Sequence, residues 1–183
     1  MENFISKTFL ENIKTESLIE SVKMFSDVKK IRDSRKKENR VTIFLSHKHS
    51  DAEVLKSFIF LLRKKGIDVY VDWMDYDMPK TTDGSTAERI KKKIKEMDKF
   101  ILLATEDAIS SKWCNWELGY GDSIKHPENL AILPITNQTD NIWSGNEYLQ
   151  IYPIITAEYQ YIIGSYYVEY KGVKMSFIDW LKK

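Results

Sequence analysis

The stretch VTIFLSHKHSDAEVLKSFIFLLRKKGIDVYVDW, residues 41–73, decides the fold class of this chain. It begins with VTIFLS and ends with IDVYVDW, two apolar runs that are typical of buried strands. Between them, apolar side chains recur at the spacing of one helix face, at Leu55, Phe58, Ile59 and Leu62. Asp51 stands where an N-cap is expected, and Gly66 stands where a left-handed residue would end the helix. The stretch therefore predicts a strand–helix–strand unit of a parallel sheet.

The same alternation continues towards the C-terminus. A loop over residues 75–85 and an amphipathic helix lead to a third strand, KFILLAT, and a helix containing residues 111–120 leads to a fourth strand, NLAILPIT. The tail predicts a hairpin around Lys171 and Gly172 and a short closing helix, FIDWLKK. The sequence thus predicts an α/β fold, a parallel β-sheet flanked by helices.

The first 38 residues differ from this pattern. Apolar side chains recur there at helical spacing, at Leu18, Val22 and Phe25. The run KKIRDSRKKENR, residues 29–40, is highly charged and has almost no apolar side chains, as is typical of a solvated linker. We therefore expect a helical arm and charged linker over residues 1–38, and a single α/β domain over residues 39–183.

The composition limits the classes of partner. The 28 Lys and Arg residues are balanced by 27 Asp and Glu residues, so no overall charge favours nucleic acid or an anionic membrane. No apolar run approaches the length of a membrane span, about 18 residues, and the start MENFISKTFLENIK lacks the apolar block of a signal peptide. Cys114 is the single cysteine, which excludes an internal disulfide. We expect a cytoplasmic protein that binds neither nucleic acid nor membrane.

The carboxyl ends of parallel strands meet at one edge of a sheet, and open α/β sheets bind ligands there. The loops that follow the first three strands contain SHKHSD, WMDYDMPKTTDGS and SSKWCNWE. We expect their polar side chains to surround one cleft, namely Ser46, His47, Lys48, Asp77 and Glu117. Trp113 and Glu117 are four residues apart, so they are expected on one face of a helix.

Other residues of these loops have simpler interpretations. His47 and His49 alternate, but no Cys or carboxylate completes a tetrahedral set, so we expect no metal ion. Cys114 has no base close by in sequence and is interpreted as an unreactive thiol. Asp72 and Asp83 are typical of turns, although Asp83 is kept among the candidate substrate contacts.

Three motifs in order, VTIFLSHKHSD, GIDVYVDW and SKWCNWELGYGD, resemble successive motifs of the Toll/interleukin-1 receptor (TIR) domain. The resemblance extends over about residues 41–137, and residues 74–85 fall where the family has its BB loop. Trp113 and Glu117 match the WxxxE helix of the catalytic members. The chain is similar to stand-alone bacterial TIR proteins of anti-phage systems such as Thoeris.

The resemblance implies cleavage of NAD⁺ at the bond between nicotinamide and ribose, with NAD⁺ as substrate and no cofactor. It implies a linear or cyclic ADP-ribose-type product that activates a separate effector, and self-association through TIR surfaces and the BB loop. One carboxylate, Glu117, suffices for catalysis. The ring nitrogen of nicotinamide is cationic in NAD⁺, so nicotinamide leaves as a neutral molecule and needs no proton. The substrate contacts would be Ser46, His47, Lys48, His49, Asp77, Asp83 and Trp113.

Two other functions remain open on the sequence alone. A non-catalytic TIR module would signal by self-association, and it would need no acid at position 117. An enzyme like the nucleoside deoxyribosyltransferases would also use a glutamate, but it would take a nucleoside and make no contact to a diphosphate.

Overall fold

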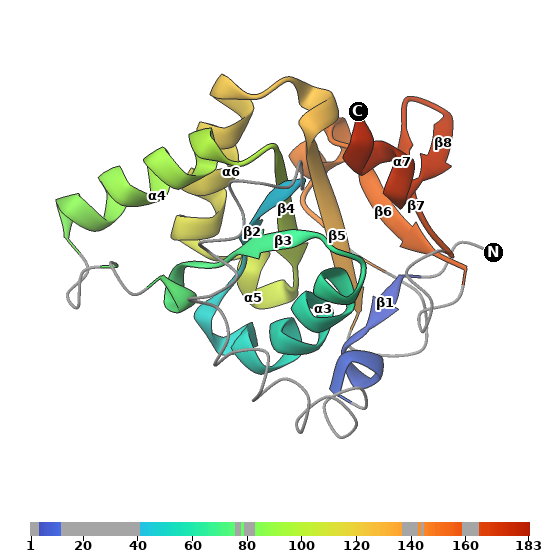
Figure 1. The fold of residues 1–183 in the computed structure, drawn as a ribbon, viewed down its shortest axis with the longest axis horizontal. Coiled ribbons are helices and arrows are strands. Elements are labelled where there is room, and N and C mark those ends of the chain that lie inside the picture. The colour runs from blue at the N-terminus through green and yellow to red at the C-terminus, as the bar shows by residue number, and fades with distance from the viewer. Residues whose placement is uncertain are drawn as a thin grey trace.

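The computed structural model describes residues 4–11, 41–75, 78, 83–136, 143, 145–158 and 165–183. Its centre is a mixed sheet with the strand order β3-β2-β4-β5-β6-β7-β8, and β1 lies beside β5 (Figure 1). The parallel part contains β2 (Thr42–Ser46), β3 (Asp68–Tyr70), β4 (Lys99–Ala104), β5 (Leu130–Thr136) and β6 (Ile154–Ala157). The predicted α/β fold class is confirmed.

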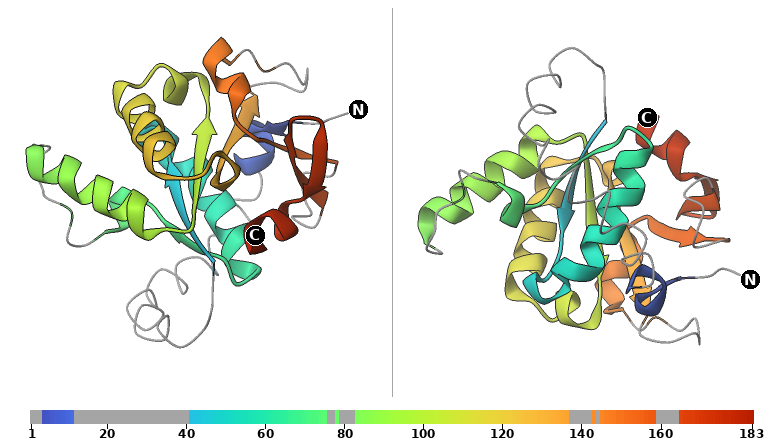
Figure 2. Two further views of the ribbon diagram at one scale, coloured as in Figure 1. Left: turned by 90° about the horizontal axis from the view of Figure 1, so that it is seen from above. Right: turned by 60° about the horizontal axis from the view of Figure 1, so that its bottom comes forward.

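Helices cover both faces of the sheet (Figure 2). One face packs against α3 (Ala52–Lys64) and α7 (Phe177–Lys182). The other face packs against α4 (Gly84–Glu96), α5 (Glu106–Ile109) and α6 (Lys112–Ile124). Because both faces are covered, β4 and β5 are buried along their whole length, which explains their continuous apolar sequences.

The predicted hairpin is confirmed as β7 (Tyr166–Tyr170) and β8 (Val173–Ser176). Its two turn residues, Lys171 and Gly172, both have positive φ, 50° and 76°, as the tight turns of twisted hairpins require. Gly66 has a φ of 75° directly after α3, so its predicted role at the helix end is also confirmed.

Two local predictions were wrong in detail. The second strand was predicted over IDVYVDW, but β3 is shorter. After Val71 the chain turns into a 3₁₀ helix, η3 (Asp72–Met74). Asp51 is the N-cap residue of α3, as predicted, but its side chain makes no capping hydrogen bond. Its carboxylate instead accepts a hydrogen bond of 2.6 Å from Thr105 Oγ1, because burial brings the two side chains together after β4.

The start of the chain is built into the sheet. β1 (Ile5–Ser6) pairs in parallel with Ile135 and Thr136 of β5, and a short helix over residues 7–11 follows. Ile5, Phe9 and Leu10 are buried in the same core as α3. Residues 12–38, including the predicted helix around Leu18, Val22 and Phe25, lie outside the described residues, and the boundary after residue 38 stays a prediction.

This packing has a measurable consequence for stability. Leu10 is fully buried, so Leu10→Ala is expected to lower the free energy of unfolding by about 2–5 kcal/mol. Thr8 is exposed on the same short helix, and Thr8→Ala is the control, with an expected change within about 0.5 kcal/mol. Denaturant unfolding of the whole chain measures both. Equal unfolding midpoints for the two variants would contradict a core role for the N-terminal segment.

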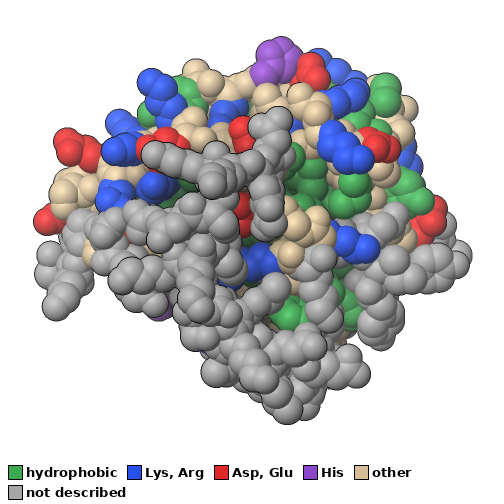
Figure 3. Space-filling view, viewed as in Figure 1, with side chains coloured by type: hydrophobic (Ala, Val, Ile, Leu, Met, Phe, Trp, Pro, Cys, Tyr) green, Lys and Arg blue, Asp and Glu red, His purple; other side chains and the backbone are tan. Residues whose placement is uncertain are grey.

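On the face shown in Figure 3, basic and acidic side chains are interspersed over the described residues. No helix among the described residues is long and apolar enough to cross a membrane.

Candidate active site

The candidate site is centred on a buried pair, Ser46 and Glu117. Ser46 is the last residue of β2 and is 1% exposed, while Glu117 lies in α6 and is 7% exposed. The Ser46 hydroxyl donates a hydrogen bond of 2.5 Å to Glu117 Oε2. The structure therefore places these two predicted site residues together at the carboxyl edge of the sheet.

Close packing of α6 on the sheet makes this contact possible. Gly121 follows Glu117 by one helical turn, and a Cβ added there would lie 3.4 Å from side-chain atoms of Phe100 and Leu130. The N-terminus of α6 is fixed as well, because the Ser111 side chain accepts a hydrogen bond from the backbone N–H of Cys114. The helix is thus held against the strands that end at the site.

Burial controls the charge of Glu117. The pKa of Glu117 is raised to about 8, chiefly by removal from water and to a smaller extent by the nearby negative charge of Asp72. The hydrogen bond from Ser46 acts in the opposite direction, because it stabilises the carboxylate. A carboxyl group with a pKa near neutrality changes its charge easily when a ligand enters, which is typical of functional sites.

Asp72 is a site residue that the sequence interpretation missed. It begins η3, in agreement with the predicted turn, but its Oδ1 lies 3.7 Å from Nε2 of His47. The His47 Nδ1 lies 3.2 Å from the carbonyl oxygen of Leu45, which makes Nδ1 the protonated nitrogen of a neutral ring. Burial lowers the pKa of His47 and favours that neutral form. The signal in the sequence that could have indicated this role was the position of Asp72 at the carboxyl end of the second predicted strand.

Lys48 and His49 are exposed at the start of the loop after β2, where a 3₁₀ helix, η2 (His49–Asp51), leads into α3. Ser50 donates a 3.1 Å hydrogen bond to Asp107, which ties this loop to α5. The positive charge of Lys48 is close enough to lower the pKa of Cys114, although burial dominates and raises it. Lys48 therefore lies near the buried pair, with its amine in solvent.

Trp113 is 40% exposed at the start of α6, and its indole contacts Trp116 edge-on, with ring centroids 5.3 Å apart. Trp116 is partly buried against the core beneath α4 and α6. The predicted contact between Trp113 and the substrate stays a prediction. Burial keeps the thiol of Cys114 protonated, in agreement with its interpretation as unreactive.

The remaining candidates belong to the loop between β3 and α4. Asp77 lies outside the described residues. Asp83 is the N-cap of α4, and its Oδ1 accepts hydrogen bonds from the backbone of Ser85 at 2.9 Å and of Thr86 at 3.3 Å. The Ser85 hydroxyl also donates to it and lowers its pKa. A contact between Asp83 and substrate stays a prediction.

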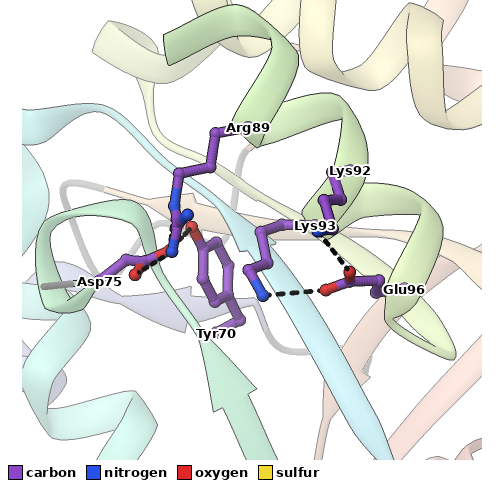
Figure 4. Close-up of polar contacts among 6 residues, drawn as sticks. All are labelled: Tyr70, Asp75, Arg89, Lys92, Lys93 and Glu96. Carbon is purple, nitrogen blue, oxygen red and sulfur yellow. Dashed lines mark hydrogen bonds and ion pairs between the residues drawn. The ribbon is translucent and has the colours of Figure 1, made fainter. Parts of the chain in front are cut away.

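The first residue of this loop, Asp75, is anchored by a cluster that the sequence interpretation missed (Figure 4). Arg89 of α4 donates two hydrogen bonds to it, from Nε at 2.8 Å and from Nη2 at 2.7 Å. The Tyr70 hydroxyl donates a third, of 2.8 Å. This bidentate ion pair fixes the start of the loop against α4.

A separate hollow of about 620 Å³, lined by residues that include Asp122, Tyr152 and Glu169, contains none of the predicted site residues.

The fold agrees with the comparisons with known proteins. The family model described as TIR domain matches residues 43–162, which is more than half of the chain, so the chain belongs to the TIR domain family. It is 31% identical over 151 residues to a probable 3′ cyclic ADP-D-ribose synthase, ThsB′, of Bacillus cereus strain MSX-D12; this match covers 80% of the chain and 72% of that protein. It is 37% identical over 103 residues to a probable 2′ cyclic ADP-D-ribose synthase, TcpO, of Methanobrevibacter olleyae; this match covers 55% of the chain but only 28% of that protein.

Proposed function

We propose that this chain is an enzyme that cleaves NAD⁺ at the bond between nicotinamide and ribose and forms a cyclic ADP-ribose signal. The observation that carries the proposal is the buried Glu117, held by Ser46 at the carboxyl edge of the sheet. The similarity to proteins named as cyclic ADP-ribose synthases supports the same reaction. Burying a carboxyl group costs free energy. A module that acts only by self-association does not need such a group at this position.

The chemistry follows from the charges. When the glycosidic bond breaks, its electron pair leaves with the nicotinamide nitrogen, which becomes neutral, and positive charge develops on the anomeric carbon. An ionised Glu117 would stabilise that charge, and its burial strengthens the interaction because little water screens it. A hydroxyl of the second ribose would then attack the anomeric carbon and lose its proton, which closes the ring. Attack by water would give linear ADP-ribose instead.

Mass spectrometry of the products from NAD⁺ tests this proposal. We expect nicotinamide and a product one water lighter than ADP-ribose. Nicotinamide with linear ADP-ribose alone would support cleavage and contradict cyclisation. Intact NAD⁺, with release of a free base from a deoxynucleoside, would favour the transferase-like alternative.

The proposal extends to the setting of the reaction. Lys48 and His49, which are exposed beside the buried pair, would contact the diphosphate. We further propose that the enzyme acts in the cytoplasm in anti-phage immunity, that it assembles through TIR surfaces and the BB loop, and that its product activates a separate effector. These points rest on the resemblance to stand-alone bacterial TIR proteins.

A further inference from the structure

The register of two neighbouring strands places a second acid beside the catalytic pair. β2 and β3 are parallel, and Phe44 lies level with Tyr70, with their rings stacked at a centroid distance of 5.5 Å. Val71 is extended, with a φ of −136° and a ψ of 144°, so side chains keep alternating as far as the next residue. Ser46 projects from the same face as Phe44, two residues earlier in β2, and Asp72 follows Tyr70 by the same two residues. The Asp72 Oδ1 lies 3.7 Å from Nε2 of His47, the residue that follows Ser46.

The helix α6 covers that same face and brings Glu117 to Ser46. The carboxyl groups of Asp72 and Glu117 therefore both lie beside the segment Ser46–His47, Asp72 against His47 from the end of β3 and Glu117 against Ser46 from the helix. Asp72 is 41% exposed, so a ligand that enters the site can reach it, whereas Glu117 is buried. The arrangement gives the site a buried acid and a solvent-facing acid.

Electrostatics agree with this geometry. The charge of Asp72 acts on Glu117 and raises its pKa, after the larger effect of burial. His47 faces Asp72 but is kept neutral by burial, which lowers its pKa. His49 and Asp51 also act on this cluster, through the pKa of His47. Glu117 and, more weakly, Lys48 act on the pKa of the neighbouring Cys114. The carboxylate of Asp72 therefore disfavours the ionised form of Glu117.

We propose that Asp72 makes the site selective for the oxidised, cationic nicotinamide ring of NAD⁺ over the neutral ring of NADH. The two dinucleotides have nearly the same shape and differ by one positive charge on the ring. A cationic ring is attracted by the charge of Asp72 and favours the ionised form of Glu117 as well, whereas a neutral ring gains neither interaction. Asp72 is thus a specificity-determining residue, and this inference rests on the proposed function.

Inhibition kinetics with Asp72→Asn test the proposal. The inhibition constant of NADH divided by the KM of NAD⁺ measures the preference for the cation. We expect this ratio to fall roughly three- to tenfold in Asp72→Asn, because one exposed charge acts through partly screened solvent. The acid limb of the pH profile of kcat/KM is expected to move to lower pH, because Glu117 loses a repelling neighbour. Asp72→Glu keeps the charge and is expected to keep most of the preference.

Glu106→Gln is the matched control, because it removes an exposed carboxylate from the helix that follows β4, at the same edge of the sheet. Its ratio and pH profile are expected to equal those of the wild type. A folded Asp72→Asn protein with a lower kcat but an unchanged ratio and pH profile would overturn the proposal. If the wild type releases no nicotinamide, the proposed function fails. The ratio of the dissociation constants of NADH and NAD⁺, measured by calorimetry, then tests the role of Asp72 separately.

Discussion

Glu117→Gln is expected to reduce nicotinamide release from NAD⁺ by roughly 10³-fold or more, the scale on which active sites lose rate when a charge-stabilising group is removed. The amide has the shape of the acid and can still accept the Ser46 hydrogen bond, but it carries no negative charge for the developing cation. The measurement is nicotinamide release under saturating NAD⁺, with the melting temperature as a check of folding.

Glu106→Gln is again the control for this experiment, since the same chemical change is made there at an exposed residue. It is expected to retain the wild-type rate. A folded Glu117→Gln protein that releases nicotinamide as fast as the wild type would refute the catalytic assignment.

The second large effect is expected from pH. Catalysis needs the ionised carboxylate, and burial raises the pKa of Glu117 to about 8 in the unliganded enzyme. The value of kcat/KM should therefore rise about tenfold per pH unit below pH 8 and level off above it. Initial rates at low NAD⁺ concentration between pH 5.5 and about 9.5 measure this profile. A flat profile over that range would show that Glu117 is already ionised in the free enzyme.

Stability should change with pH in the opposite direction. The folded-state pKa of Glu117 is raised, so the folded protein binds this proton more tightly than the unfolded chain does. The resulting stabilisation is fully present below the unfolded pKa and is lost as pH rises through about 8. Melting temperatures of the wild type should therefore fall over this window relative to those of Glu117→Gln, which lacks the titration. A fall in this pH range that is absent in Glu117→Gln shows that Glu117 titrates there, and the rise of kcat/KM over the same range is then assigned to Glu117 rather than to His47.

The parts of the fold that the sequence predicted are those with a local periodic signal. VTIFLS, KFILLAT and NLAILPIT are continuous apolar runs because their strands are covered on both faces, and the helix before Gly66 has a complete apolar face. β1 was missed because two residues have no period, and its pairing with β5 joins positions about 130 residues apart.

For the site, the rule that parallel strands end at one edge correctly brought Ser46 and Glu117 together across 71 residues. The resemblance supplied the role of Glu117. Asp72 was missed because an aspartate at the start of a turn satisfies local preferences and also fits an active site, and only the strand register decides its neighbours. Asp51 was misinterpreted for a related reason, since a distant hydroxyl, that of Thr105, replaced the expected local cap.

The pairing of β1 with β5 also determines when this domain can finish folding during synthesis. The partner residues of Ile5 and Ser6 are Ile135 and Thr136, so the ribosome must add about 130 residues before the pairing can form. At typical translation rates this delay is on the order of ten seconds. During that time β1, which precedes the buried Phe9 and Leu10, lacks the strand with which it pairs. The nascent chain thus carries this apolar segment without its native strand partner until most of the domain has been synthesised.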